Sequence, residues 1–150
     1  MDDLRELYQE MILDHYKRPR NCHRLDTANH HAEGYNPLCG DKVTVFVLVD
    51  DNVIVDISFE GSGCAICTAS TSVMTESLKG KTVDEAGALF GKFRELVTGG
   101  LEAAGEIEKL GKLAIFAGVR EYPIRIKCAT LAWHTFEAAL ADTSETVTTE

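Results

Sequence analysis

A short segment at residues 36–41, Asn-Pro-Leu-Cys-Gly-Asp, holds a thiol and a carboxylate two positions apart. Side chains at positions i and i+2 of an extended chain point the same way, so Cys39 and Asp41 can face one point in space. Pro37 and Gly40 favour a bend in the backbone there. The segment therefore predicts a site for a cation.

Two more cysteines can complete such a site. Cys64 follows a Gly-Ser-Gly bend, and Cys128 follows Arg-Ile-Lys. Three thiolates and one carboxylate make a closed tetrahedral ligand set for zinc. Each cysteine taken singly could also be a small buried apolar residue, and it is the joint pattern that favours a metal site.

These motifs resemble, in the same order, those of the SufU-type iron-sulfur cluster assembly proteins, which are relatives of the IscU and NifU scaffolds. The resemblance covers nearly the whole chain and implies a zinc site made by Cys39, Asp41, Cys64 and Cys128. It also implies that Cys39 is the catalytic thiol, the one that accepts sulfur. The matching segments are residues 7–10, 14–17, 19–21, 36–41, 61–70 and 125–134.

The resemblance implies a zinc-dependent sulfurtransferase that takes persulfide sulfur from a SufS-type cysteine desulfurase, an enzyme with pyridoxal phosphate, and serves downstream cluster assembly proteins. Transfer requires a thiolate to attack the terminal sulfur of a persulfide, whereas zinc holds the lone pairs of its thiolates. One ligand must therefore leave the metal. We expect Cys39 to leave, because its loop contains Gly and Pro while helices anchor Cys64 and Cys128. Asp41 would be an exchangeable oxygen ligand.

Two other functions use the same ligands. The first is a scaffold on which iron forms a [2Fe-2S] cluster, since such clusters also bind thiolates. The IscU type has His directly before the last cysteine and a Leu-Pro-Pro-Val-Lys segment ahead of it. This chain has Lys127 and, at residues 121–125, Glu-Tyr-Pro-Ile-Arg, which favours sulfur transfer. The second is a zinc-stapled interaction domain without turnover.

Two residues beside the ligands have more than one interpretation. Cys67 forms a Cys-x-x-Cys with Cys64, the spacing of thiol exchange motifs. We expect Cys67 to be a packed thiol, and a substitute ligand or a resolving thiol are the alternatives. Arg125 lies on nearly the same helix face as Cys128, where it either compensates the negative charge of the ligands or is simply solvated.

The remaining candidates for metal binding are weaker. Cys22 stands alone in the sequence. The pair His30-His31 could bind a metal, but adjacent side chains diverge, so we expect it to lie in a surface loop.

A basic patch is expected at the end of the first helix. It either steers an acidic partner protein or consists of solvated cations that suit a helix C-terminus. Its members are His15, Lys17, Arg18, Arg20, His23 and Arg24.

The composition predicts a single domain over residues 1–150, with 45% hydrophobic residues to form a core. Five scattered cysteines without a secretion signal favour a reducing compartment, so we expect a cytoplasmic protein. No apolar run approaches the roughly 20 residues that span a bilayer, and no membrane is expected. Lys and Arg number 15 against 24 Asp and Glu, and the net charge of −9 opposes nucleic-acid binding.

The fold expected is α+β: a small antiparallel β-sheet, made of a hairpin and a possible third strand, packed on one face against several helices, with the metal site at one end. Alternating apolar residues at 43–49 and 53–59, joined by Asp-Asp-Asn, predict the hairpin. The second strand has one mainly polar face, which indicates that helices cover only one side of the sheet.

Helical periodicity predicts helices over residues 3–16 and 64–79, and a weaker one over 101–113. Thr82 and Glu85 have the spacing of a capping box, and Gly99-Gly100 should end the helix that they begin. Pro123 should open the last helix. Residues 21–36 show no clear period, and we expect a flexible tail over residues 143–150.

Overall fold

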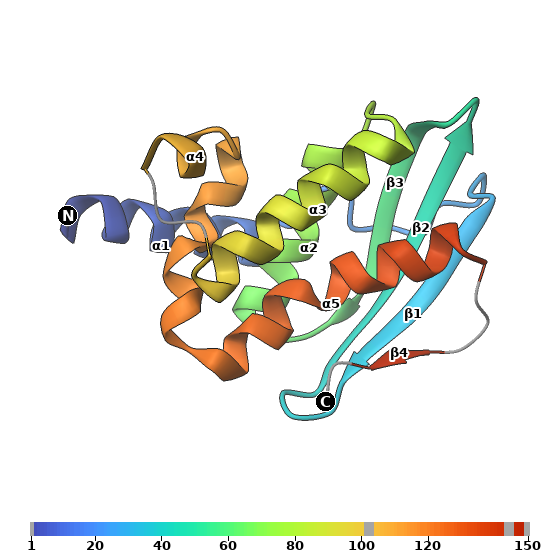
Figure 1. Cartoon of the computed structure of the whole chain (residues 1–150). Coiled ribbons are helices and arrows are strands. Elements are labelled where there is room, and N and C mark those ends of the chain that lie inside the picture. Colours follow the sequence, from blue (N-terminus) through green and yellow to red (C-terminus); the bar gives the residue numbers. More distant parts are fainter. Residues whose placement is uncertain (1, 101–103, 143–145, 149–150) are drawn as a thin grey trace.

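The computed structural model describes residues 2–100, 104–142 and 146–148 (Figure 1). Its helices are α1 (Asp2–Lys17), α2 (Ala65–Leu78), α3 (Val83–Thr98), α4 (Ala104–Glu108) and α5 (Pro123–Leu140), with a 3-10 helix, η1 (Gly111–Glu121). Its strands are β1 (His30–Asn36), β2 (Asp41–Asp50), β3 (Val53–Ser62) and β4 (Val147–Thr148). The predicted α+β class is confirmed.

The strands form one sheet in the order β3-β2-β1-β4. β1, β2 and β3 are antiparallel, whereas β4 runs parallel to β1. The helices lie on one face of the sheet, and α5 crosses β1 and β2 (Figure 1). Alternate side chains of β2 and β3 face these helices and are buried: Val43, Val45, Val47, Ile57 and Phe59.

The hairpin of β2 and β3 follows the sequence pattern. Its turn residues Asp51 and Asn52 have φ values of 51° and 64°, the left-handed conformation that Asp and Asn tolerate. The register shifts once, between Leu48 and Val49. The hairpin therefore forms because the turn chemistry and the alternation of apolar residues agree.

The helix boundaries also follow their local signals. The capping box of Thr82 and Glu85 begins α3, and Gly99, with φ of 88°, ends it. Pro123 is in the first turn of α5. No helix among the described residues has both the length and the apolar character needed to cross a bilayer.

An aromatic cluster fixes α5, the helix that carries Cys128. The Trp133 ring stacks on Phe93 at 4.9 Å and on Phe90 at 5.5 Å between ring centroids. Phe116 of η1 meets Phe93 edge to face at 5.8 Å. Aromatic burial of this kind ties α3, η1 and α5 into one unit.

One sequence expectation is wrong, and two others are met only in part or lie partly outside the described residues. The segment with His30-His31 is the strand β1 and not a surface loop. In the predicted tail, Val147 and Thr148 form β4, while residues 143–145 and 149–150 lie outside the described part. Of the weak helix over 101–113, residues 101–103 lie outside the described part, and the rest is α4 followed by the start of η1.

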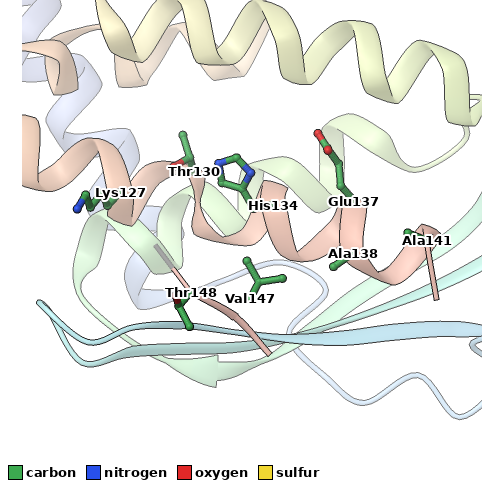
Figure 2. A pocket seen from close by; sticks show the side chains of 8 residues that line it. All are labelled: Lys127, Thr130, His134, Glu137, Ala138, Ala141, Val147 and Thr148. Atoms are coloured by element: carbon green, nitrogen blue, oxygen red, sulfur yellow. The ribbon is translucent and has the colours of Figure 1, made fainter. Parts of the chain in front are cut away.

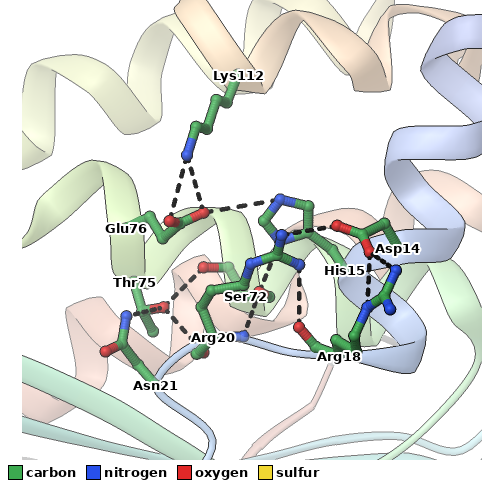
Figure 3. A network of polar contacts seen from close by, with 9 residues as sticks. All are labelled: Asp14, His15, Arg18, Arg20, Asn21, Ser72, Thr75, Glu76 and Lys112. Carbon is green, nitrogen blue, oxygen red and sulfur yellow. Dashed lines mark hydrogen bonds and ion pairs between the residues drawn. The ribbon is translucent and has the colours of Figure 1, made fainter.

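The end of α1 is held to α2 by a polar network (Figure 3). His15 is buried, and its Nδ1 lies 2.7 Å from Ser72 Oγ. Its Nε2 lies 3.7 Å from a carboxylate oxygen of Glu76, which also pairs with Lys112 of η1 at 3.2 Å. The network therefore joins α1, α2 and η1.

The basic patch is partly neutralised within the chain. Arg18 and Arg20 each contact Asp14 at 2.6 Å, and the hydrogen bond from Arg20, followed by that from Arg18, lowers the pKa of Asp14 to about 2. Arg24 pairs with Asp26 at 3.2 Å. These contacts favour the local, structural interpretation of the patch over a role in steering partners.

Candidate metal centre

The turn at residues 36–41 joins β1 to β2 and carries the first two predicted ligands. The backbone N–H of Gly40 donates to the Asn36 carbonyl oxygen at 2.8 Å, and Gly40 has φ of 73°, which suits glycine. Cys39 is half-buried on this turn, whereas Asp41 is completely buried at the start of β2. The turn therefore presents its thiol outward and keeps its carboxylate inside.

The structure brings three of the four predicted ligands together. One ligand atom each from Cys39, Asp41 and Cys128 lies within 4.8 Å of the other two. The sulfurs of Cys39 and Cys128 are 3.3 Å apart, although 89 positions separate them in the chain. Cys128 is buried in the second turn of α5. The turn and α5 thus meet through these side chains.

Cys64 lies beside this group, but its sulfur is more than 4.8 Å from at least one of the three ligand atoms. It is the N-cap of α2, as the sequence predicts, and its sulfur accepts the backbone N–H of Cys67 at 3.4 Å. Its own backbone N–H donates to Asp41 Oδ1 at 2.8 Å. Its side chain packs with Cys39 against the cluster that contains Cys128.

Gly63 leaves room for the Asp41 carboxylate. A Cβ at this position would lie 2.7 Å from Asp41 Oδ1, closer than side-chain carbons come to other atoms. Any larger residue would push the carboxylate away from the N–H of Cys64. The Gly-Ser-Gly bend is therefore fitted to the carboxylate as well as to the start of α2.

Asn36 is a site residue whose contacts the sequence does not reveal. Its side chain is completely buried, and its Nδ2 donates to Asp41 Oδ2 at 3.2 Å and to Cys128 Sγ at 3.5 Å. Its Oδ1 accepts the backbone N–H of Leu38 at 3.2 Å. One amide therefore holds two candidate ligands and the turn that carries a third.

Three further residues that the sequence suggests for the metal site differ in their distance from the candidate ligands. Arg125 is exposed at the start of α5, and its Nη1 lies 3.9 Å from Cys39 Sγ, where a cation offsets thiolate charge. Cys67 is buried, and burial raises the pKa of its thiol. Cys22 is exposed and outside the group, so the structure brings only Arg125 to the outer side of the site.

The protonation of the thiols is coupled. The close interaction of the Cys64 and Cys128 side chains lowers the pKa of Cys64 and raises that of Cys128, and burial also raises the latter. The N–H of Cys67 at the start of α2 adds to the stabilisation of the Cys64 thiolate. In the protein without metal, these contacts favour the thiolate at Cys64 and the protonated thiol at Cys128.

The donor set fits a thiophilic divalent metal. Cys39, Asp41 and Cys128 offer two sulfurs and one oxygen at one point, and Cys64 adjoins them. Zinc binds thiolate and carboxylate ligands in tetrahedral geometry, and iron-sulfur clusters bind thiolates as well. The residues therefore fit either group.

A separate hollow of about 540 Å³ lies between α5 and β4 (Figure 2). Residues of α5, among them Lys127 and His134, line it together with Val147 and Thr148 of β4, and none of its lining residues in the described part of the chain is a cysteine. This hollow is therefore separate from the group of candidate ligands.

Comparisons with known proteins place these features in a family. Residues 7–129 match the family described as NifU-like N terminal domain. The iron-sulfur cluster assembly scaffold protein IscU of Streptococcus pyogenes serotype M1 is 41% identical over 93% of this chain and 86% of that protein. The zinc-dependent sulfurtransferase SufU of Bacillus subtilis (strain 168) is 38% identical over 93% of this chain and 92% of that protein.

Solved structures agree with this match. The crystal structure of FiSufU from Fervidobacterium islandicum AW-1 gives a TM-score of 0.80 at 40% identity and covers 87% of this chain and 94% of that one. The N-terminal part of a NifU-like protein from Brucella abortus gives 0.79 at 25% identity and covers 90% and 92%. Sequence and architecture therefore point to the same group of proteins.

Proposed function

Because this chain belongs to the family of NifU-like N-terminal domains, with IscU and SufU among its relatives, we propose that it serves iron-sulfur cluster assembly as a zinc-dependent sulfurtransferase. A SufS-type cysteine desulfurase would supply the sulfur. One observation carries the proposal: Cys39 is half-buried on a turn, whereas Asp41 and Cys128 beside it are buried. A partner can thus reach Cys39, whereas Cys64, which is also half-buried, is held at the N-cap of α2.

Cys39 is the thiol that we expect to react. Its thiolate would attack the outer sulfur of a cysteine persulfide on the desulfurase. A new S–S bond forms to Cys39, the S–S bond of the donor breaks, and the donor leaves as a thiolate. The outer sulfur keeps its proton, so the exchange needs neither an oxidant nor a reductant.

The other residues of the site would bind and orient. We propose Cys39, Asp41, Cys64 and Cys128 as the residues that hold zinc, which when bound supplies positive charge that keeps thiols deprotonated. Arg125, whose Nη1 lies 3.9 Å from the Cys39 sulfur, would place a positive charge beside the reacting thiol. Asn36 would keep Asp41 and Cys128 in place.

A desulfurase assay with measured metal content tests the proposal. The zinc-loaded protein should accelerate the release of sulfur by a SufS-type desulfurase, and Cys39→Ser should remove the acceleration. After mixing, mass spectrometry should find one added sulfur atom on Cys39. Acceleration by Cys39→Ser equal to that of the wild type would overturn the assignment of Cys39.

Cys22→Ser is the matched control for this assay. Cys22 is exposed and is not part of the group of candidate ligands, so its loss should leave acceleration unchanged. Tight zinc binding without any acceleration by the wild type would favour an interaction domain stapled by zinc.

A cluster scaffold is the second candidate. The Streptococcus pyogenes relative is named an iron-sulfur cluster assembly scaffold, and the thiols of this site suit iron as they suit zinc. Anaerobic reconstitution with iron and sulfide should then give a visible chromophore that passes to an apo-acceptor. A colourless protein that accelerates the desulfurase would favour sulfur transfer.

A further inference from the structure

An apolar groove of about 410 Å³, here called the α1 groove, lies between α1, η1 and the start of α5. Its floor consists of Tyr8, Ile12, Ile66, Ile115 and Val119. At its rim, Leu4 is 49% exposed and Tyr122 is 60% exposed. Exposed apolar side chains gathered around one hollow are typical of interaction sites.

The α1 groove is continuous with the thiol site. Ile66 belongs to its floor and also packs against the cluster that contains Cys128. Arg125 lines the groove, and its Nη1 lies 3.9 Å from Cys39 Sγ. A protein segment seated in the groove would therefore end next to the thiol that we propose as the sulfur acceptor.

The charge at the rim is positive on a chain whose net charge is −9. Arg5, Arg120 and Arg125 line the α1 groove, and Glu121 is the one carboxylate among its lining residues. Glu121 contacts Arg5 at 3.6 Å. Within the described residues, neither Arg120 nor Arg125 forms an ion pair with a carboxylate. Arg120, and Arg125 beside its contact with Cys39 Sγ, can therefore meet carboxylates of a partner.

We propose that the α1 groove binds an acidic amphipathic segment of the cysteine desulfurase. Apolar side chains of the segment would cover the floor, and its carboxylates would meet Arg120 and Arg125. This inference rests on the proposed function and adds a second contact area to it. The segment would hold the partner while its persulfide faces Cys39.

Charge and apolar contacts can be removed separately without touching the proposed ligands. Arg120→Glu reverses an exposed charge, and Leu4→Asp places a carboxylate on an exposed apolar position. The matched controls are Lys92→Glu on α3 and Leu13→Asp on α1, which are also exposed and do not line the groove. Circular dichroism and thermal unfolding would establish that all four variants fold.

Calorimetric titration of the zinc-loaded protein with the desulfurase gives the decisive quantity, the dissociation constant. Arg120→Glu and Leu4→Asp should each weaken binding about tenfold or more, whereas the controls stay within about twofold of the wild type. Raised salt should weaken the wild type more than Arg120→Glu. At saturating protein, sulfur transfer to Cys39 should be unchanged in both groove variants.

A photo-crosslinking residue in place of Leu4 would identify the occupant. The crosslinked peptide should come from the desulfurase and contain both Asp or Glu and apolar residues, and the same crosslinker at Leu13 should give none. Unchanged dissociation constants in both groove variants would overturn the inference about the α1 groove. They would not contradict the proposed sulfur transfer. Binding that is weakened in the variants while the wild type transfers no sulfur would support the groove and reject the proposed function.

A small apolar anion is the competing occupant. The fluorescent probe 8-anilinonaphthalene-1-sulfonate combines an apolar ring system with one negative charge. If the groove variants lose the fluorescence of this probe but keep the wild-type affinity for the desulfurase, the groove serves a small ligand and the proposal is wrong. A wild-type protein that does not bind the desulfurase at all would reject both proposals.

Discussion

Asn36 shows how one buried amide can organise a thiol site. Its two donated hydrogen bonds reach Asp41 and Cys128, and its acceptor oxygen fixes the backbone of Leu38. Loss of a partner that orients metal ligands in this way typically lowers metal affinity by about 10- to 100-fold. Asn36 therefore belongs to the site although it is not a candidate ligand.

Asn36→Ala should weaken zinc binding about 10- to 100-fold, because Asp41 and Cys128 lose the donor that holds them. Competition with a chromophoric chelator measures the affinity. Asn36→Asp keeps the size of the side chain and the acceptor for Leu38 but loses the donating N–H groups, and it should weaken binding as well. Wild-type affinity in Asn36→Asp would show that donation is not what matters.

Asn29→Ala is the matched control for this experiment. The Asn29 side chain also bonds to a strand, through the backbone N–H and carbonyl of Val49, but it touches no candidate ligand. The zinc affinity of Asn29→Ala should equal that of the wild type. A comparable loss in both variants would mean that general loosening of the sheet explains the effect.

At the residue scale, the sequence was enough to find the candidate ligands but not the residues that hydrogen-bond to them. Cys39 and Asp41 are close in the chain, and types and spacing point to them directly. The contact of Asn36 with Cys128 joins positions 92 apart, and no local pattern reveals such a contact. The sequence also does not determine the distance between the Cys64 sulfur and the other candidate ligands, because Cys64 comes from a different element, the start of α2.

At the scale of elements, β1 is the strand that sequence periodicity missed. Its inward residues are Ala32, Gly34 and Asn36, which are small or polar where a buried strand normally has branched apolar side chains. The reason is the close approach of α5, because a Cβ at Gly34 would overlap Thr135 Oγ1. A strand packed this tightly lacks the apolar alternation by which strands are recognised.

Gly34→Ala should therefore lower the free energy of unfolding by about 1–3 kcal/mol, since Thr135 and α5 must shift to admit the methyl group. Urea unfolding measures the loss. Gly87→Ala on α3 is the control, because its added Cβ has nothing within 4 Å, and it should be neutral or more stable by up to about 1 kcal/mol. Equal stability of both variants would contradict the tight packing of α5 on β1.

The buried His15 makes the attachment of α1 sensitive to pH. The pKa of His15 is lowered from its ordinary value of 6.5, mainly by burial and next by the positive charge of Arg20. The negative charge of Glu76 opposes this shift. Lys112 lowers the pKa and Asp14 raises it, both more weakly. The folded state thus takes up the proton less readily than the unfolded state. Stability should be complete above the unfolded pKa and fall as pH decreases through it.

Unfolding experiments between pH 7.5 and pH 5.5 check this expectation, within the range about the ordinary His pKa. The wild type should lose stability across the range, and His15→Gln should lose less, whatever its stability at pH 7.5. His134, whose pKa burial also lowers, remains in both proteins and serves as the common background. Parallel curves for the two proteins would rule out His15 as the source.

At the scale of the whole molecule, the candidate ligands join three parts of the fold. Cys39 and Asp41 come from the turn between β1 and β2, Cys64 from the start of α2, and Cys128 from α5. The family resemblance predicts this convergence, and periodicity predicts most of the helices and the hairpin. The pairing of β4 with β1 was not predictable, because two residues are too few to show a period.

Zinc bound by these parts should stabilise the entire fold. At a free concentration about a hundredfold above the dissociation constant, the melting temperature should rise by about 5–10 °C for a chain of this size. Differential scanning calorimetry with and without a chelator measures the rise. In Cys128→Ala, zinc should raise the melting temperature little or not at all. A full rise in that variant would show that zinc binds at another site.

The 3.3 Å separation of the Cys39 and Cys128 sulfurs has a practical meaning for anyone who handles this molecule. In air, dioxygen can remove two electrons and two protons from the pair, and the resulting disulfide would consume a proposed metal ligand and the proposed reactive thiol together. A preparation left unprotected would then look inert without being misfolded. Purification under nitrogen, or recovery of activity with dithiothreitol, would distinguish inactivation by this disulfide from true inactivity.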